Sequence, residues 1–178
     1  MTTSTLARTI NNVLNAPTIS RVRRNHALEH ATVHLLNQRM PGLALAGHSD
    51  PGGFWIIGEV DTEHMAAAVT EALERLRSGE RHLAIHPHCG TNLVTNAVVA
   101  GGFASLAWIG GGTRKGSRMD RILFSILLAL AGLFVSLPLG YRIQQRITTD
   151  GNPRDLRVVQ VLRSQQGNFA AHRITTEG

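Results

Sequence analysis

Three histidines recur at a spacing of four in the segment NHALEHATVHLL, which begins at Asn25. They are His26, His30 and His34, and Glu29 stands just before the middle one. On a helix they drift gradually around the axis, while Glu29 lies beside His26 and His30 on the side opposite His34. Two imidazoles one turn apart can bind one metal ion, and a nearby carboxylate can take a proton from a water that the metal activates. The alternative is a hydrogen-bonded polar helix face without a metal.

Residues 26–30 match the pattern His-x-x-Glu-His, the inverted order of the zinc-protease motif. This pattern predicts His26 and His30 as metal ligands and Glu29 as the catalytic base. Five residues are a short pattern, and the chain contains nine histidines. A second, independent group of ligands is therefore needed to support a metal site.

A second cluster, His-Pro-His-Cys-Gly-Thr-Asn, begins at His86 and contains Cys89, the single cysteine of the chain. It directly precedes an apolar stretch, and Thr91 or Asn92 is expected to cap that helix. A thiol at this end faces the positive pole of the helix dipole, which favours the thiolate. Thiolate is the form that binds zinc or attacks an electrophile. The alternative is a small packed cysteine beside His86 and His88 in a loop.

The two motifs in this order, ahead of an apolar helix, resemble the YqhQ-like family of bacterial membrane proteins, which are described as predicted metal-dependent enzymes. The segment His-Ala-Leu-Glu-His-Ala-Thr is similar to an uncharacterised bacterial membrane family as well. The matching residues are His26, Glu29, His30, His86, Pro87, Cys89, Gly90 and Thr91. The resemblance implies a metal, with His86 and Cys89 joining the first two histidines as ligands, and ranks His34 and His88 below them. The chain is shorter than YqhQ-like proteins and has fewer membrane segments.

Two helices are expected in the first part of the chain, and the first of them carries the His-x-x-Glu-His motif. Residues 19–39 read as a helix with Thr18 or Ser20 as its cap, ending before a Pro-Gly pair. Apolar residues recur at helical spacing again over residues 62–77, after Asp61 or Thr62 as cap.

Five short segments are expected to form strands. Residues 43–49 and 53–60 flank the turn sequence Asp-Pro-Gly-Gly and predict a hairpin, and residues 82–86 predict a third strand. The segments 156–162 and 168–174 predict a second hairpin that completes the sheet. The expected fold class is α+β, a small helix-strand-strand-helix-strand domain with helices on one face of a sheet.

Two uncharged stretches, residues 92–110 and 122–141, predict a transmembrane helical hairpin, because a bilayer span needs about 20 apolar residues. The alternative is buried helices in a soluble core. The sequence thus divides into a domain of residues 1–91 with the candidate metal site, a membrane hairpin of residues 92–141, and a C-terminal β-hairpin segment of residues 142–178.

Small residues recur at a spacing of four on both predicted spans. They are Ala97, Gly101 and Ser105 on the first span, and Ser125 and Ala129 on the second. Such spacing lets two helices pack closely in lipid. The alternative is that it reflects composition alone.

The basic residues of the chain bear on its orientation in the membrane and on whether it binds lipid or nucleic acid. The formal net charge of +6 comes almost entirely from arginine, since Lys115 is the single lysine, and an anionic lipid surface explains this basicity better than nucleic acid does. Arginines occur both in the loop of residues 111–121 and on the outer flanks of the spans, so the positive-inside rule gives competing answers. The first 24 residues lack a signal-peptide core. We therefore expect both ends in the cytoplasm of a bacterial cell, with the chain crossing the inner membrane.

Three functions are compatible with these residues. The first is a membrane-anchored, zinc-dependent hydrolase at the cytoplasmic membrane surface, with Glu29 as base and His26, His30, His86 and Cys89 as ligands. The second is a non-catalytic metal- or haem-binding membrane protein or assembly factor. The third is a Cys89 nucleophile paired with a histidine. The expected partner is the lipid bilayer and not nucleic acid; the substrate is undefined, and homo-oligomerisation is left open.

Overall fold

The computed structural model describes residues 3–109, 118–166 and 169–178. The chain divides into two compact units. The α/β unit comprises residues 1–86 and 145–178, and the two-helix unit comprises residues 87–144. The expected mixed α+β class, with an antiparallel sheet and two long apolar helices, is confirmed.

Three α-helices and a short 3₁₀ turn belong to the α/β unit. The helices are α1 (Thr3–Leu14), α2 (Pro17–Arg39) and α3 (Thr62–Arg77), and the turn η1 covers Arg81–Ala84. The predicted second helix matches α3 at both ends. Helix α1 was not predicted from the sequence.

The start of α2 differs from the expected one. The helix begins at Pro17, and Ala16 occupies the cap position without a side-chain hydrogen bond. Neither Thr18 nor Ser20 is the cap, since both lie inside the helix. Proline suits the first helical position because its fixed φ angle is helical and its missing N–H would have no partner there.

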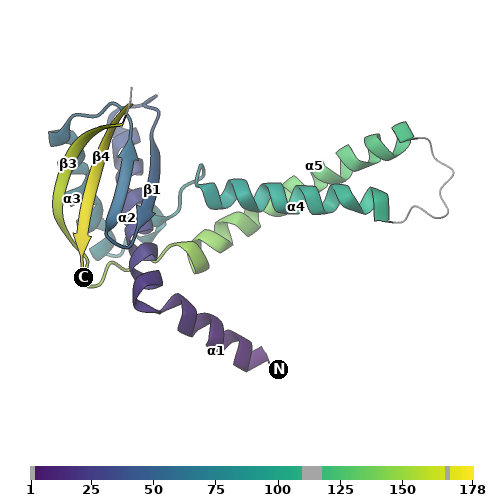
Figure 1. The fold of residues 1–178 in the computed structure, drawn as a ribbon, viewed down its shortest axis with the longest axis horizontal. Coiled ribbons are helices and arrows are strands. Elements are labelled where there is room, and N and C mark those ends of the chain that lie inside the picture. The colour runs from purple at the N-terminus through teal and green to yellow at the C-terminus, as the bar shows by residue number, and fades with distance from the viewer. Residues whose placement is uncertain (1–2, 110–117, 167–168) are drawn as a thin grey trace. The chain divides into compact units, whose positions relative to one another are not determined.

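Four antiparallel strands form one sheet in the order β1-β2-β4-β3 (Figure 1). Their bounds are β1 (Ala46–Asp50), β2 (Gly53–Ile57), β3 (Arg157–Gln166) and β4 (Phe169–Glu177). The C-terminal hairpin thus completes the sheet begun by the first hairpin, as expected. Its connection, residues 167–168, lies outside the described residues.

The tight turn between β1 and β2 has the expected composition. Asp50 pairs with Gly53 across the hairpin, and the Asp50 Oδ1 atom accepts a hydrogen bond of 2.7 Å from the Gly52 N–H. Gly53 has φ +143°, and a Cβ atom there would overlap the carbonyl oxygen of Ile174. Glycine is therefore required at this position.

The strand predicted over residues 82–86 is wrong, because that region forms η1. Leu83 and Ala84 are adjacent in sequence, yet both are buried. A strand would direct them to opposite faces, whereas a helical turn packs both toward the core. The edge of β2 that such a strand could have used pairs with β4 instead.

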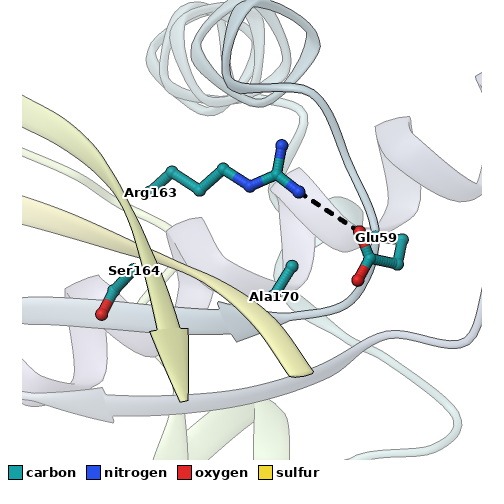
Figure 2. A pocket seen from close by; sticks show the side chains of 4 residues that line it. All are labelled: Glu59, Arg163, Ser164 and Ala170. Carbon is teal, nitrogen blue, oxygen red and sulfur yellow. Dashed lines mark hydrogen bonds and ion pairs between the residues drawn. The ribbon is translucent and has the colours of Figure 1, made fainter. Parts of the chain in front are cut away.

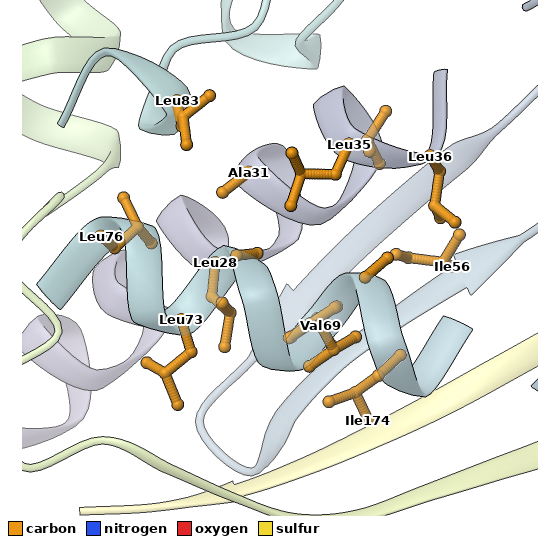
Figure 3. Close-up of a cluster of buried hydrophobic side chains, with 14 of the residues drawn as sticks. Leu28, Ala31, Leu35, Leu36, Ile56, Val69, Leu73, Leu76, Leu83 and Ile174 are labelled. Carbon is orange, nitrogen blue, oxygen red and sulfur yellow. The ribbon is translucent and has the colours of Figure 1, made fainter. Parts of the chain in front are cut away.

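The hydrophobic core of the α/β unit lies between the sheet and the helices α2 and α3 (Figure 3). Alternate residues of β2 and β4 face these helices, as the buried Phe54, Ile56 and Ile174 show. The helices contribute leucine, valine, alanine and methionine side chains, among them Leu28, Ala31, Leu35, Leu36, Met65, Val69, Leu73 and Leu76. This packing fixes which face of α2 points away from the core.

The two-helix unit consists of α4 (Gly90–Ile109) and α5 (Arg118–Ile143), and a π-helical turn, Gln144–Thr148, follows. Both helices are long and apolar enough to cross a membrane. Residues 110–117, which include most of the predicted loop, lie outside the described residues.

The two helices approach each other closely at Gly132. A Cβ atom on Gly132 would lie 2.9 Å from the Ala100 Cα atom and 3.0 Å from the Phe103 Cβ atom. One turn further along α5, the Ser136 hydroxyl donates a 2.7 Å hydrogen bond to the Asn96 Oδ1 atom. A glycine and a polar pair thus contribute to this contact, and such residues are common where helices pack in lipid.

Only some of the small residues that were predicted to lie between the two helices make contacts there. On α4, a Cβ atom added to Gly101 would meet nothing within 4 Å among the described residues. On α5, Ser125 does contribute, because its Oγ atom accepts a hydrogen bond of 2.9 Å from the Trp108 indole N–H. The contact face of α4 is thus rotated from the stripe of Ala97, Gly101 and Ser105.

Candidate metal centre

His26 and His30 lie one turn apart on α2, and their imidazole ring centroids are 4.3 Å apart. His30 is buried, with 3% of its surface exposed, and His26 is half-buried. The helix places the two rings side by side because residues i and i+4 share one face. The α/β unit thereby brings the two predicted histidine ligands together.

Backbone carbonyl groups fix the tautomer of both rings. The Nδ1 atom of His26 lies 2.9 Å from the Thr148 carbonyl oxygen, and the Nδ1 atom of His30 lies 2.7 Å from the Ala84 carbonyl oxygen. A carbonyl oxygen can only accept, so each Nδ1 atom carries the proton. In the neutral ring, the Nε2 atom then holds the lone pair. Histidines that bind metals usually show this arrangement, with the other ring nitrogen donating to a carbonyl or carboxylate.

His86 extends the histidine cluster. Its ring centroid lies 5.7 Å from that of His30 and 4.9 Å from that of His34. The Nε2 atom of His34 donates a hydrogen bond of 2.7 Å to the carbonyl oxygen of Ile85. His34 thus holds the residue that precedes His86, a role that its position outside the motif did not indicate.

Glu29 is buried against β1. Its Oε2 atom accepts a hydrogen bond from the Ser49 hydroxyl, and the carboxylate fills the space that a side chain at Gly47 would occupy. Ser49 and Gly47 are on the face of β1 that is turned toward α2. The hydroxyl group stabilises the ionised carboxylate and restricts its orientation.

Cys89 belongs to the two-helix unit and occupies the amino-terminal end of α4. Its carbonyl oxygen accepts a hydrogen bond of 2.9 Å from the Asn92 N–H, and its Sγ atom accepts one of 3.4 Å from the Thr91 N–H. Cys89 therefore takes the place that the sequence reading gave to Thr91 or Asn92. Three peptide links join it to His86, which limits their Cα separation to about 11 Å.

Arg23 secures the segment that carries the Thr148 carbonyl group. Its guanidinium group donates to the carbonyl oxygens of Ile147 at 2.7 Å, Thr149 at 3.0 Å and Arg146 at 3.1 Å. The planar guanidinium group suits such multiple donation. The orientation of His26 thus depends on an arginine one turn earlier on α2.

A pocket of about 390 Å³ lies elsewhere on the α/β unit (Figure 2). Its lining includes Glu59, Arg163, Ser164 and Ala170, and none of the predicted ligands. The Glu59 carboxylate and the Arg163 guanidinium group are 3.3 Å apart. Both side chains are largely exposed, so this ion pair contributes little to stability, and the pocket offers no metal ligands comparable with the histidine cluster.

Two side chains of the sheet, His172 and Asp50, have a lowered pKa, and the structure gives the cause of each. Burial lowers the pKa of His172, and the nearby positive charge of Arg163 lowers it further. The forked hydrogen bonds from Arg173, at 2.6 and 2.9 Å, lower the pKa of Asp50. Asp50 and Arg173 thus pair between β1 and β4, whereas the His172 Nε2 atom lies 3.2 Å from the Thr62 hydroxyl at the start of α3.

Some of the contacts that orient the site could be predicted from the sequence and others could not. Any residue can supply a backbone carbonyl group, so Ala84 and Thr148 gave none. Gly47 did give one, because a glycine inside a strand often marks a close approach by another group.

The chain is similar to a protein family and to a bacterial relative, neither of which has a described activity. A family model described as a domain of unknown function (DUF6391) matches residues 21–161, a range that contains all the predicted site residues and both apolar helices. An uncharacterized protein of Picosynechococcus sp. (strain ATCC 27264 / PCC 7002 / PR-6) is 40% identical over 139 residues. The match covers 72% of this chain and 65% of that protein, so it spans just under two thirds of the relative's length. No solved structure matches the chain.

Proposed function

We propose that this protein is a membrane-anchored, zinc-dependent hydrolase at the cytoplasmic surface of a bacterial inner membrane. The chain belongs to the DUF6391 family, whose description states no activity. The proposal therefore rests on the chemistry of its side chains. The observation that carries the proposal is the pair of imidazoles whose Nδ1 atoms donate to the carbonyl oxygens of Thr148 and Ala84. Both rings are thereby prepared to offer Nε2 to one cation.

The proposed ligands are the imidazoles of His26, His30 and His86 and the thiolate of Cys89. Imidazole and thiolate together favour zinc over harder cations such as magnesium and calcium. His86 lies beside His30 in the α/β unit, and the chain itself keeps Cys89 within three residues of His86. His86 or Cys89 would supply the third ligand in a hydrolase, because a catalytic zinc site keeps its fourth position for water.

Glu29 is proposed as the general base. Zinc held by these ligands would supply a Lewis acid and would lower the pKa of a bound water toward 7. The Glu29 carboxylate, oriented by the Ser49 hydroxyl, would accept the proton of that water. The resemblance of the His-x-x-Glu-His segment to YqhQ-like proteins supports these roles.

Membrane anchoring is assigned to α4 and α5, which have the length and composition of spanning helices. The small and polar contacts between them, at Gly132 and between Ser136 and Asn96, are those expected where apolar side chains face lipid. The excess of arginine suits an anionic membrane surface. We place both ends of the chain in the cytoplasm.

Metal analysis of the purified full chain is the first test. We expect one zinc ion per chain, and its loss in His30→Asn. Asparagine keeps an N–H that can donate to the Ala84 carbonyl group but lacks the Nε2 ligand, so a folded protein without metal is the expected result. His64→Ala is the matched control, because His64 is exposed on α3 and pairs with Asp61 at 3.6 Å. Wild type without stoichiometric metal, or His30→Asn with undiminished metal, would contradict the proposal.

A second candidate is a metal-binding protein without turnover. The burial of Glu29 against β1 and its hydrogen bond to Ser49 favour this alternative, because they also suit a purely structural carboxylate. Glu29→Gln separates the two. In a hydrolase this variant keeps zinc and loses hydrolysis of p-nitrophenyl acetate in detergent micelles, whereas zinc binding without such turnover in wild type favours the non-catalytic protein.

A further inference from the structure

The first helix, α1, has two chemically different faces. Leu6, Ile10 and Val13 recur at positions i, i+4 and i+7, and are 56%, 46% and 52% exposed. Residues at this spacing form one stripe along a helix. Three large aliphatic side chains in a row thus lack cover by the described residues of the α/β unit.

The opposite face of α1 is polar. It carries Thr5, Asn11, Asn12 and the single cation of the helix, Arg8, all of them exposed. At the border between the two faces, the Thr9 hydroxyl donates a hydrogen bond of 3.0 Å to the Thr5 carbonyl oxygen. Acidic residues do not occur before Glu29. The charge of this region therefore suits an anionic surface and would not be repelled by it.

A helix of 12 residues is marginal in water unless its apolar face is covered. We propose that α1 lies in the plane of the membrane, with Leu6, Ile10 and Val13 among the acyl chains and Arg8 at the level of the lipid phosphates. The inference rests on the proposed anchoring by α4 and α5, which would hold the chain at a bilayer. Strong segregation of faces with modest total hydrophobicity is the pattern of helices that lie on a membrane rather than across it.

Spin-label accessibility tests this placement in the full chain. In a Cys89→Ser background, single cysteines are introduced on the apolar face by Leu6→Cys, Ile10→Cys and Val13→Cys. Matched cysteines on the polar face come from Thr5→Cys, Asn11→Cys and Asn12→Cys. Each labelled protein is placed in vesicles of phosphatidylethanolamine and phosphatidylglycerol, and collisions with oxygen and with a water-soluble nickel chelate are measured. We expect oxygen to dominate on the apolar face and nickel on the polar face.

Two results would overturn the inference. Equal nickel accessibility on both faces would place α1 in water. Shielding of the apolar face from both reagents, with spin broadening that disappears on dilution with unlabelled chain, would show that a second copy covers it. Leu127→Cys on α5 is the internal reference. Nickel access at position 127 would contradict membrane anchoring itself. Oxygen access at position 127 together with nickel access at position 6 would contradict only the placement of α1.

Discussion

At the scale of single residues, Gly47 and Glu29 compete for one volume between β1 and α2. A Cβ atom at position 47 would lie 2.5 Å from the Cδ atom of Glu29, and a distance this short requires one of them to move. Ser49, two residues along the same face, holds the carboxylate by a hydrogen bond. The orientation of the proposed base is thus set by the strand as well as by the helix.

We expect Gly47→Ala to lower the free energy of unfolding by about 1–3 kcal/mol, the usual cost of overpacking. In the Glu29→Ala background, the same substitution should cost much less, because the overlapping carboxylate is gone. Thermal unfolding of the four proteins of this double-mutant cycle in detergent measures the coupling. Equal costs in both backgrounds would show that the two side chains do not share this space.

The sequence predicted the relative positions of these residues better than their surroundings. The types and spacing of His26, Glu29 and His30 were sufficient to predict one histidine pair on one helix. The hydrogen bonds to Ala84 and Thr148 could not be predicted, because they depend on where the chain returns after many residues, and a carbonyl group has no signature in a sequence.

At the scale of elements, the packing of α4 on α5 depends on one face of each helix. Gly132 meets Ala100 and Phe103, whereas a Cβ atom at Gly101 would meet no described atom within 4 Å. Both glycines are inside helices, so they share the same intrinsic helix propensity. This makes them a matched pair for measuring packing alone.

Gly132→Ala should therefore be less stable than Gly101→Ala by about 1–3 kcal/mol. Both substitutions raise helix propensity by about 1 kcal/mol, and this gain cancels in the comparison. Unfolding by sodium dodecyl sulfate, followed by circular dichroism in mixed micelles, gives the two free energies. Indistinguishable values would mean that the close contact at Gly132 does not stabilise the pair.

Elements with strong periodicity or turn chemistry were predictable, and short ambiguous ones were not. The hairpin of β1 and β2 followed from Asp-Pro-Gly-Gly, and α3 followed from its apolar spacing. The segment His82–His86 alternates like a strand but is too short for alternation to decide. The stripe on α4 was misplaced because several small-residue stripes coexist in one glycine- and alanine-rich helix.

At the scale of the whole molecule, the α/β unit is interrupted in sequence by the two-helix unit. The chain leaves the α/β unit after His86 and returns at Gln145. The carbonyl groups of Ala84 and Thr148, near these two points, bind histidines that are adjacent on α2. The two points of connection are therefore close together within the α/β unit.

Replacing residues 87–144 by a flexible linker of about six Gly and Ser residues should give a water-soluble folded domain, because such a linker spans roughly 13 Å. We expect a monodisperse protein with a cooperative thermal transition by circular dichroism. A companion variant that also lacks β3 and β4 is expected to be unfolded, since it loses half of the sheet. Aggregation of the first variant in the absence of detergent would contradict the prediction.

The strand order also constrains the sequence of events during synthesis. β4 lies in the interior of the sheet, between β2 and β3, and Trp55 pairs with Arg173 across it. The ribosome must therefore deliver both apolar helices before β2 can find its partner, and closing so long a loop makes the pairing slow. Until then the β2 edge is open to other strands, and the Thr148 carbonyl group that orients His26 has not been made. The sheet and the contact that orients His26 are thus both completed only after α4 and α5 have been synthesised.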